Sequence, residues 1–160
     1  MAYTMKTEGM DGISSMLEKI EKAAPAIASK ALYEGAGIMA EEIRAGAEGI
    51  QTAPFRGAGR VWRYPSPEEK EILVKAGAGI AKFDHNGAEV DTSVGYSKTG
   101  YAELGTETKP IPLIANAINS GTSFMRKQPF FRKAARIGGQ KAMAAMTRYI
   151  ENQIDKMSKE

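Results

Sequence analysis

The stretch from Pro129 to Met157 decides the fold: PFFRKAARIGGQKAMAAMTRYIENQIDKM. Proline is favoured in the first turn of a helix, because its missing N–H would have no partner there in any case. Apolar residues then recur every three or four positions, which places them on one face of a helix. We therefore expect a long C-terminal helix over residues 129–157. Its apolar stripe consists of Phe131, Ala135, Ala142, Ala145, Met146, Tyr149, Ile150 and Ile154.

This helix is also the basic part of the chain. Residues 1–50 carry a net charge of −3 (5 Lys/Arg, 8 Asp/Glu), residues 51–124 are neutral (8 and 8), and residues 125–160 carry +6 (9 and 3). A basic end is suited either to nucleic acid or to the acidic part of a neighbouring copy. Because the chain has no other nucleic-acid motif, we favour the second. The cations of the helix are Arg132, Lys133, Arg136, Lys141 and Arg148.

The N-terminal part predicts two helices within residues 11–47. Apolar residues between Ile13 and Ile20 share one face of the first helix. We expect a break before Pro25, since the residue that precedes proline is disfavoured in helical geometry and proline favours a helix start. The second helix is expected to end at Gly46 or Gly49.

The middle of the chain predicts a loop, a short helix and antiparallel strands. Residues 51–65 mix glycine, proline, arginine and aromatic residues without periodicity, which is typical of a surface loop. The sequence Ser-Pro-Glu-Glu from Ser66 is a capping box, so a short helix is expected over 66–78. The stretch Asp84-His-Asn-Gly87 favours a hairpin turn between strands. The strands are expected within residues 79–119, with a turn-rich link from Ser97 to Pro112 and the last strand from Leu113 to Asn119.

These elements predict an α+β fold in a single domain, residues 1–160, with the N-terminal helices and the long C-terminal helix packed on a small antiparallel sheet. The chain has no cysteine, which excludes disulfides and thiolate chemistry. Residues 1–11 lack the apolar core of a signal peptide, and no run approaches the ~18 apolar residues of a membrane span. We therefore expect a soluble protein without membrane partners.

No catalytic, metal-binding or cofactor-binding constellation is evident in the sequence. The single histidine, His85, falls in the expected hairpin turn, where neighbouring side chains rarely converge on one site. Glu68, Glu69 and Glu71 come closest to a metal-ligand cluster, but negative charge is favoured in the first turn of a helix in any case. We expect neither an enzyme nor a bound cofactor.

The loop over residues 51–65 is the most suggestive binding segment. Arginine interleaved with aromatic residues is typical of protein interfaces, where these residue types dominate the binding energy. The same mixture stacks on bases and contacts phosphates in nucleic-acid-binding proteins, and it can also pack on the domain's own core. We favour the interface, and we expect deletion of the loop to leave a folded monomer that does not assemble. The candidate residues are Phe55, Arg56, Arg60, Trp62, Arg63 and Tyr64.

The residues from Leu113 to Ala135 resemble the small neck or tail-component proteins of tailed bacteriophages, whose genes lie in the head–tail joining cluster. The motif of that family is a strand that ends in an acidic residue, an aromatic residue and Gly-Thr. After a short spacer, Pro-Phe-Leu-Arg begins the last helix. Gly121-Thr122 matches, and so does Pro-Phe-Phe-Arg from Pro129, with a phenylalanine in the leucine position. Asn119-Ser120 replaces the acidic–aromatic pair.

The resemblance implies a structural virion protein of the phage neck that joins the head connector to the tail and is made in the bacterial cytoplasm. It implies a closed ring of about six or twelve copies. Its expected neighbours are a connector or head-completion protein, a tail terminator or tube protein, and the DNA that passes through the lumen. A tail-completion or terminator protein and a small basic nucleic-acid-binding module are the alternatives. Further interface candidates are Glu34, Glu41, Glu42, Gly121, Thr122, Pro129, Phe130, Phe131, Arg132, Lys133 and Arg136, with the glutamates of one copy against the cations of the next.

Overall fold

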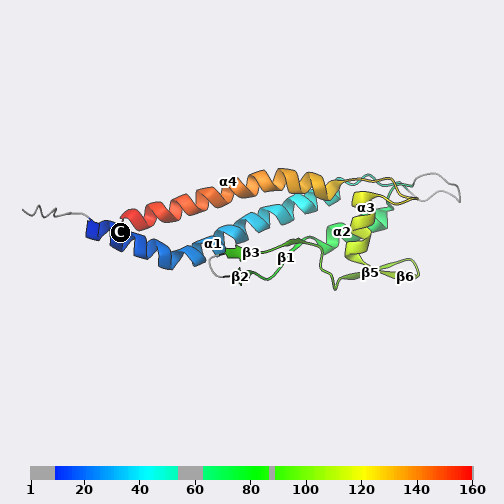
Figure 1. The fold of residues 1–160 in the computed structure, drawn as a ribbon. Coiled ribbons are helices and arrows are strands. Elements are labelled where there is room, and N and C mark those ends of the chain that lie inside the picture. Colours follow the sequence, from blue (N-terminus) through cyan, green and yellow to red (C-terminus); the bar gives the residue numbers. More distant parts are fainter. Residues whose placement is uncertain (1–9, 54–62, 87–88, 160) are drawn as a thin grey trace, which may run out of the picture.

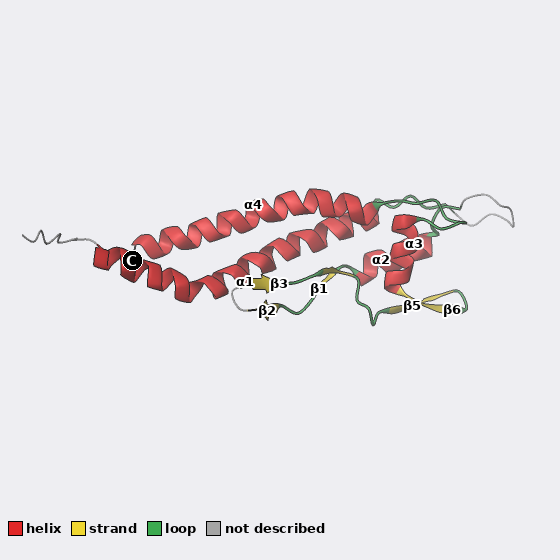
Figure 2. Cartoon of the chain, in the orientation of Figure 1, coloured by secondary structure: helices red, strands yellow, loops and turns green. Residues whose placement is uncertain are grey.

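The computed structural model describes residues 10–53, 63–86 and 89–159. Within these ranges, helices dominate and the strands are short (Figure 1 and Figure 2). The strands form three two-stranded antiparallel sheets, and the predicted α+β fold class is confirmed. In chain order the elements are α1 (Met10–Glu48), α2 (Pro67–Ala76), β1 (Gly79–Ile80), β2 (Asp84–Asn86), β3 (Glu89–Asp91), β4 (Val94–Gly95), β5 (Tyr101–Leu104), β6 (Glu107–Pro110), α3 (Ile111–Ser120) and α4 (Phe130–Lys159).

The two long helices, α1 and α4, lie side by side and antiparallel, and they give the molecule its elongated shape (Figure 1). Glycine allows them to approach closely at two levels. A Cβ atom at Gly35 would lie 2.8 Å from Met146 Sδ, and one at Gly138 would lie 2.9 Å from Met39 Sδ. The bounds of α4 confirm the predicted C-terminal helix, which was expected over 129–157.

The N-terminal helix continues through Pro25, so the prediction of a break there is wrong. α1 is a single helix of 39 residues that contains this proline. Its apolar spacing persists on both sides of the proline, and contacts with α4 offset the lost backbone hydrogen bond. The Ser29 hydroxyl donates to Pro25 O (2.8 Å). Figure 1 shows a change of direction in the blue part of α1, as expected for a proline in a helix interior.

The predicted hairpin is present, but it is interrupted and its turn is shorter than expected. β1 pairs with β4, and β2 pairs with β3. Residues 84–86 were predicted in the turn, whereas they form β2, and Asn86 pairs with Glu89. Pairing therefore extends up to the glycine of the Asn-Gly turn, because each added residue pair satisfies further backbone groups. The hairpin runs back along α1 (Figure 1).

The prediction of a strand from Leu113 to Asn119 is also wrong, because this stretch belongs to helix α3. Its buried residues are Ile114, Ala115 and Ile118, and their spacing is helical. Pro112 lies in the first turn, where proline is favoured, and α3 ends at Gly121, which has a positive φ of 78°. The isoleucines suggested β structure, but their contacts with the core decide for the helix.

One end of the molecule holds the main core. Here α2, α3 and the β5–β6 hairpin pack around the end of α1 and the start of α4, and we call this assembly the compact end (Figure 1). The β5–β6 hairpin falls in a stretch that was expected to be a turn-rich link. Its two-residue turn begins at Gly105, which has a positive φ of 66°. The buried core consists of Ile43, Ala47, Ile50, Leu73, Ile114, Ala115, Ile118, Met125, Phe130 and Ala134.

Candidate assembly surface

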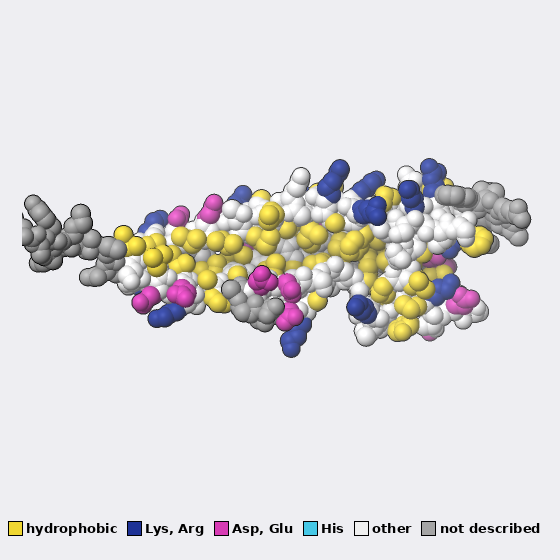
Figure 3. All heavy atoms as spheres, in the orientation of Figure 1, with side chains coloured by type: hydrophobic (Ala, Val, Ile, Leu, Met, Phe, Trp, Pro, Cys, Tyr) yellow, Lys and Arg dark blue, Asp and Glu magenta, His cyan; other side chains and the backbone are white. Residues whose placement is uncertain are grey.

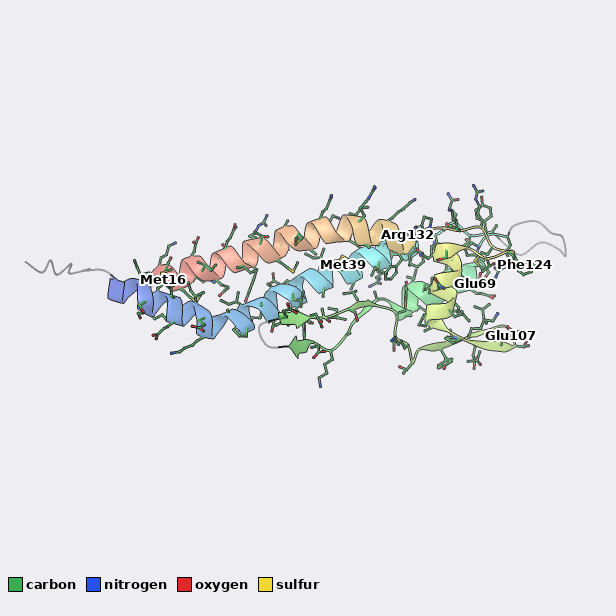
Figure 4. All side chains as sticks on the ribbon, in the orientation of Figure 1. Met16, Met39, Glu69, Glu107, Phe124 and Arg132 are labelled. Carbon is green, nitrogen blue, oxygen red and sulfur yellow. The ribbon has the colours of Figure 1, made fainter. Side chains whose placement is uncertain are left out.

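A buried ion pair fixes the segment that leads into α2. Arg63 Nη1 and Nη2 each donate to one oxygen of the Glu69 carboxylate, at 2.8 Å. The same carboxylate accepts from the Ser66 backbone N–H (2.8 Å), while the Ser66 hydroxyl accepts from Glu69 N–H (3.1 Å). The predicted capping box is therefore confirmed, and α2 begins at Pro67. Glu69 lies inside the compact end (Figure 4) and is only 6% exposed.

This environment changes the acidity of both partners. Burial alone would raise the pKa of the Glu69 carboxyl, but the hydrogen bonds from Arg63 and Ser66 and the charge of Arg63 lower that pKa below its usual value. The hydrogen bond to Glu69 raises the pKa of the Arg63 guanidinium. The pair is therefore ionised at neutral pH and holds the chain at this point.

Both ends of the aromatic and arginine-rich loop are anchored to the compact end. Ala53 N–H donates to Pro65 O (3.3 Å), and Arg63 forms a parallel bridge with Met125. Tyr64 accepts a hydrogen bond at its hydroxyl from Arg126 (2.9 Å). Of the six loop residues predicted to form an interface, Phe55, Arg56, Arg60 and Trp62 lie outside the described residues.

The amide of Gln128 joins the end of α1 to the start of α4. Its Oε1 accepts from Gln51 N–H (2.8 Å) and its Nε2 donates to Gln51 O (2.7 Å). The backbone N–H of Gln128 donates to Ile118 O (2.8 Å), which ties the same residue to α3. The sequence analysis did not identify Gln128, and a lone glutamine before a proline carries no pattern that would have revealed it.

The residues of the phage-like motif form the joint between α3 and α4. A Cβ atom at Gly121 would lie 2.9 Å from Lys127 Cβ, and the φ of this glycine is positive, so both space and geometry require glycine. Thr122 Oγ1 accepts from the backbone N–H of Met125 (3.0 Å) and so closes the turn. Phe130 begins α4, is buried in the core and packs edge-on against Phe131.

Exposed cations gather around this joint. Residues 121–150 contain seven Lys or Arg and no Asp or Glu. Figure 3 shows dark blue side chains over the N-terminal part of α4, along one edge of the molecule. Two shallow grooves, of about 590 and 540 Å³, meet at Lys127, Pro129 and Lys133. Among the described residues, no carboxylate forms an ion pair with Arg126, Lys127, Arg132, Lys133 or Arg136.

One of the three glutamates predicted to form an acidic face on α1 is paired within the chain. Glu42 forms an ion pair with Lys141 of α4 within the same chain, and its side chain is only 21% exposed. Glu34 and Glu41 are exposed, and Glu48 continues their row at the next seven-residue step. We call Glu34, Glu41 and Glu48 the glutamate row. The sequence analysis missed Glu48, although the spacing of seven residues was visible there.

Apolar side chains also reach the surface of the helix pair. Met143 is 65% exposed, and Ile150 and Ile154 are more than one-third exposed. Ile150 and Ile154 were predicted to belong to the apolar stripe, and Met143 was not included in it. The buried residues of α4 are Phe130, Ala134, Gly138 and Ala142. A yellow band of such side chains runs along the molecule in Figure 3. Burial of these side chains by a partner would be favourable.

Residues 10–53, 63–86 and 89–159 contain no group of three or more His, Cys, Asp or Glu residues placed to hold a metal ion. They also contain no helix that is long and apolar enough to cross a membrane. Comparison with protein-family models, curated proteins and solved structures gives no match.

Proposed function

We propose that this protein is a structural component of the neck of a tailed bacteriophage, where it forms a ring that joins the head connector to the tail. The main support for this proposal is the exposed apolar surface of α4, at Met143, Ile150 and Ile154. Burial of an apolar side chain from full exposure contributes roughly 1.5–3 kcal/mol, so a partner would gain about two-thirds of that at Met143 and just over one-third of it at each isoleucine. Association through shape and surface needs no catalytic site.

The position of the motif residues supports the same proposal. Gly121, Thr122 and Phe130 build the joint that sets the direction of α4 relative to α3. A protein that works as a ring subunit needs this geometry to be rigid, because small angular errors add up around a ring. The motif therefore has a structural reason to occur in such a protein.

Deletion of the gene from the phage or prophage that carries it would test this function directly. The lysate is viewed by negative-stain electron microscopy. We expect filled heads and separate tails that fail to join, and a plasmid copy of the gene should restore joined particles. Intact particles after the deletion would contradict the proposal.

Complementation of the deletion with surface variants tests whether the exposed apolar surface of α4 is needed for joining. A chain with Met143→Ser, Ile150→Ser and Ile154→Ser should fail to restore joined particles while it remains folded. The control, Leu113→Ser, changes an apolar residue that is also exposed but lies on α3. If the triple variant restores particles as well as the control does, the apolar surface of α4 does not carry the function.

A small nucleic-acid-binding module is the second candidate, and the unpaired cations around the α3–α4 joint favour it. Phosphate contacts release counterions, so such binding would weaken steeply with salt. Binding of short duplex DNA should be measured across a range of salt concentrations. Strong, salt-dependent binding at about 0.15 M salt would favour this candidate, and weak or absent binding there would exclude it.

A further inference from the structure

We propose that neighbouring copies join side by side, with the glutamate row on α1 of one copy against Arg132, Lys133 and Arg136 on α4 of the next. We call these three cations the cation row. The inference rests on the proposed ring and adds its contact surface, its register and the reason it closes. It is argued from the positions of the two rows around the helix pair and from their heights along it.

The glutamate row lies on one flank of α1, between the side that meets α4 and the side along which the hairpin runs, and Glu34 borders a groove with Phe83 and Tyr149. Residues seven apart differ by only about 20° around a helix, so the three glutamates share one side. The side of α1 that meets α4 carries Ala31, Gly35 and Glu42. At about 100° per residue, the glutamate row lies roughly a third of a turn from that side, where α1 is exposed.

Two members of the cation row, Arg132 and Arg136, lie on the outer side of α4, while Lys133 lies on its flank, beside a groove that Glu42 and Gly46 of α1 also line. The side of α4 that meets α1 carries Ala134, Gly138 and Ala142. Arg132 and Arg136 are displaced from that side by nearly half a turn, so they point away from α1, whereas Lys133 is displaced by about a third of a turn. Figure 4 shows Arg132 at the start of α4, and Figure 3 shows the cations of this region along one edge of the molecule.

The two rows also stand at the same height along the helix pair. Gly138 lies against Met39 and Glu42, and Gly46 lies against Phe130. Counting from these contacts, Glu41 is level with Arg136, and Glu48 is within about one turn of Arg132. Two copies placed side by side without any axial shift therefore bring glutamates to cations.

This register explains why the assembly would close. A contact between two different surfaces of one molecule generates a ring only if the step from copy to copy has no translation along the axis. The rows meet that condition, because their heights agree within one copy. On the same outer side of α4 lie Met143, Ile150 and Ile154, so the contact continues into an apolar part.

Charge reversal on each edge tests the inference. The variants are E41R/E48R on α1, R132E/R136E on α4, and one chain that carries all four changes. All four residues are exposed. E48R removes the exposed Arg44–Glu48 ion pair within α1, which contributes little to stability. The changes at Glu48 and Arg132 place charge favourably for the helix dipole, so the fold should persist, as circular dichroism will verify. E103R, on exposed β5, is the control.

Sedimentation velocity and native mass spectrometry report the oligomeric state. Each double variant should associate about 100-fold more weakly than the wild-type chain, because like charges then face each other. The fourfold variant should regain assembly, as should an equimolar mixture of the two double variants. The control E103R should assemble as the wild type does.

The outcomes distinguish a failure of this contact from a failure of the proposed ring. A wild-type chain that stays monomeric at every concentration would overturn both this contact and the proposed ring. Wild-type oligomers that both double variants also form, or that the fourfold variant does not recover, would overturn the contact alone. Oligomers of R132E/R136E that have lost binding to duplex DNA would assign the cation row to nucleic acid and likewise overturn the inference.

Discussion

The compact end and the α1–α4 helix pair both include parts of α1 and α4 but are stabilised differently. At the compact end, large side chains such as Leu73 and Ile118 are fully buried, and polar contacts such as Arg63–Glu69 fix the geometry. Along the helix pair, small residues allow close contact, while Met143 and its neighbours remain exposed. The first region therefore has a large buried core, whereas the second leaves apolar side chains at the surface.

The largest effect on stability is expected at Phe130, where the two regions meet. Phe130→Ala should lower the free energy of unfolding by about 3–5 kcal/mol, because it removes a buried aromatic side chain and leaves a cavity. Met143→Ala, on the exposed side of α4, should change it by less than about 0.5 kcal/mol. Urea denaturation measures both. Equal losses would show that the helix pair stabilises the monomer as much as the compact end does.

Glu69→Gln should have an intermediate effect. It removes the charged partner of Arg63, which should cost about 1–3 kcal/mol in the free energy of unfolding. Glu71→Gln is the control, since Glu71 is exposed and pairs with Lys75 in the same helix. A loss no larger than that of the control would mean that the buried pair does not hold the compact end.

The pH dependence of stability sharpens this test. The pKa of Glu69 is lower in the folded chain than the usual value of 4.5, so the unfolded chain takes up a proton first as the pH falls. The stabilisation is therefore present above about pH 4.5 and is lost as the pH falls through the folded pKa. Thermal unfolding between pH 7 and 3 should show a smaller acid-induced decrease in Tm for Glu69→Gln than for the wild type.

The smallest effect is expected at a pair of adjacent glycines in α4. Nothing lies within 4 Å of a Cβ atom at Gly139, so Gly139→Ala should stabilise the helix by about 0.5–1 kcal/mol. At Gly138 the added Cβ would meet Met39 Sδ and lie 3.2 Å from Glu42 Cβ, which should cancel that gain. Differential scanning calorimetry compares the two. A matching gain at Gly138 would mean that the helices are less tightly packed than the structure indicates.

The sequence allowed correct prediction of elements whose signals are local. The capping box at Ser66 and the 3.6-residue repeat of α4 depend on nearby residues alone, and both predictions are confirmed. Pro25 and the stretch Leu113–Asn119 were mispredicted because distant contacts decide their structure. A proline can remain inside a helix when a partner helix supports it, and an isoleucine-rich stretch becomes helical when its helical face meets a core.

For the candidate site, residue types were predicted better than their grouping. The basic character of α4 and the acidic character of α1 were evident from the charge distribution. The pairing of these charges was not evident, because the ion pair of Glu42 with Lys141 depends on the antiparallel contact of two helices far apart in the sequence. Glu48, by contrast, could have been found from its spacing of seven residues after Glu41, although its ion pair with Arg44 was not predicted.

The antiparallel pairing of α1 with α4 also has a consequence for synthesis. The whole stretch from Gly49 to Pro129 separates the two helices, so α1 leaves the ribosome long before its partner exists. Closing so long a stretch carries a large entropic cost, and folding that depends on such distant contacts is slow. During that interval the apolar face of α1 is open to other nascent chains. A protein that associates through its surface must therefore complete its own helix pair before it meets a neighbour.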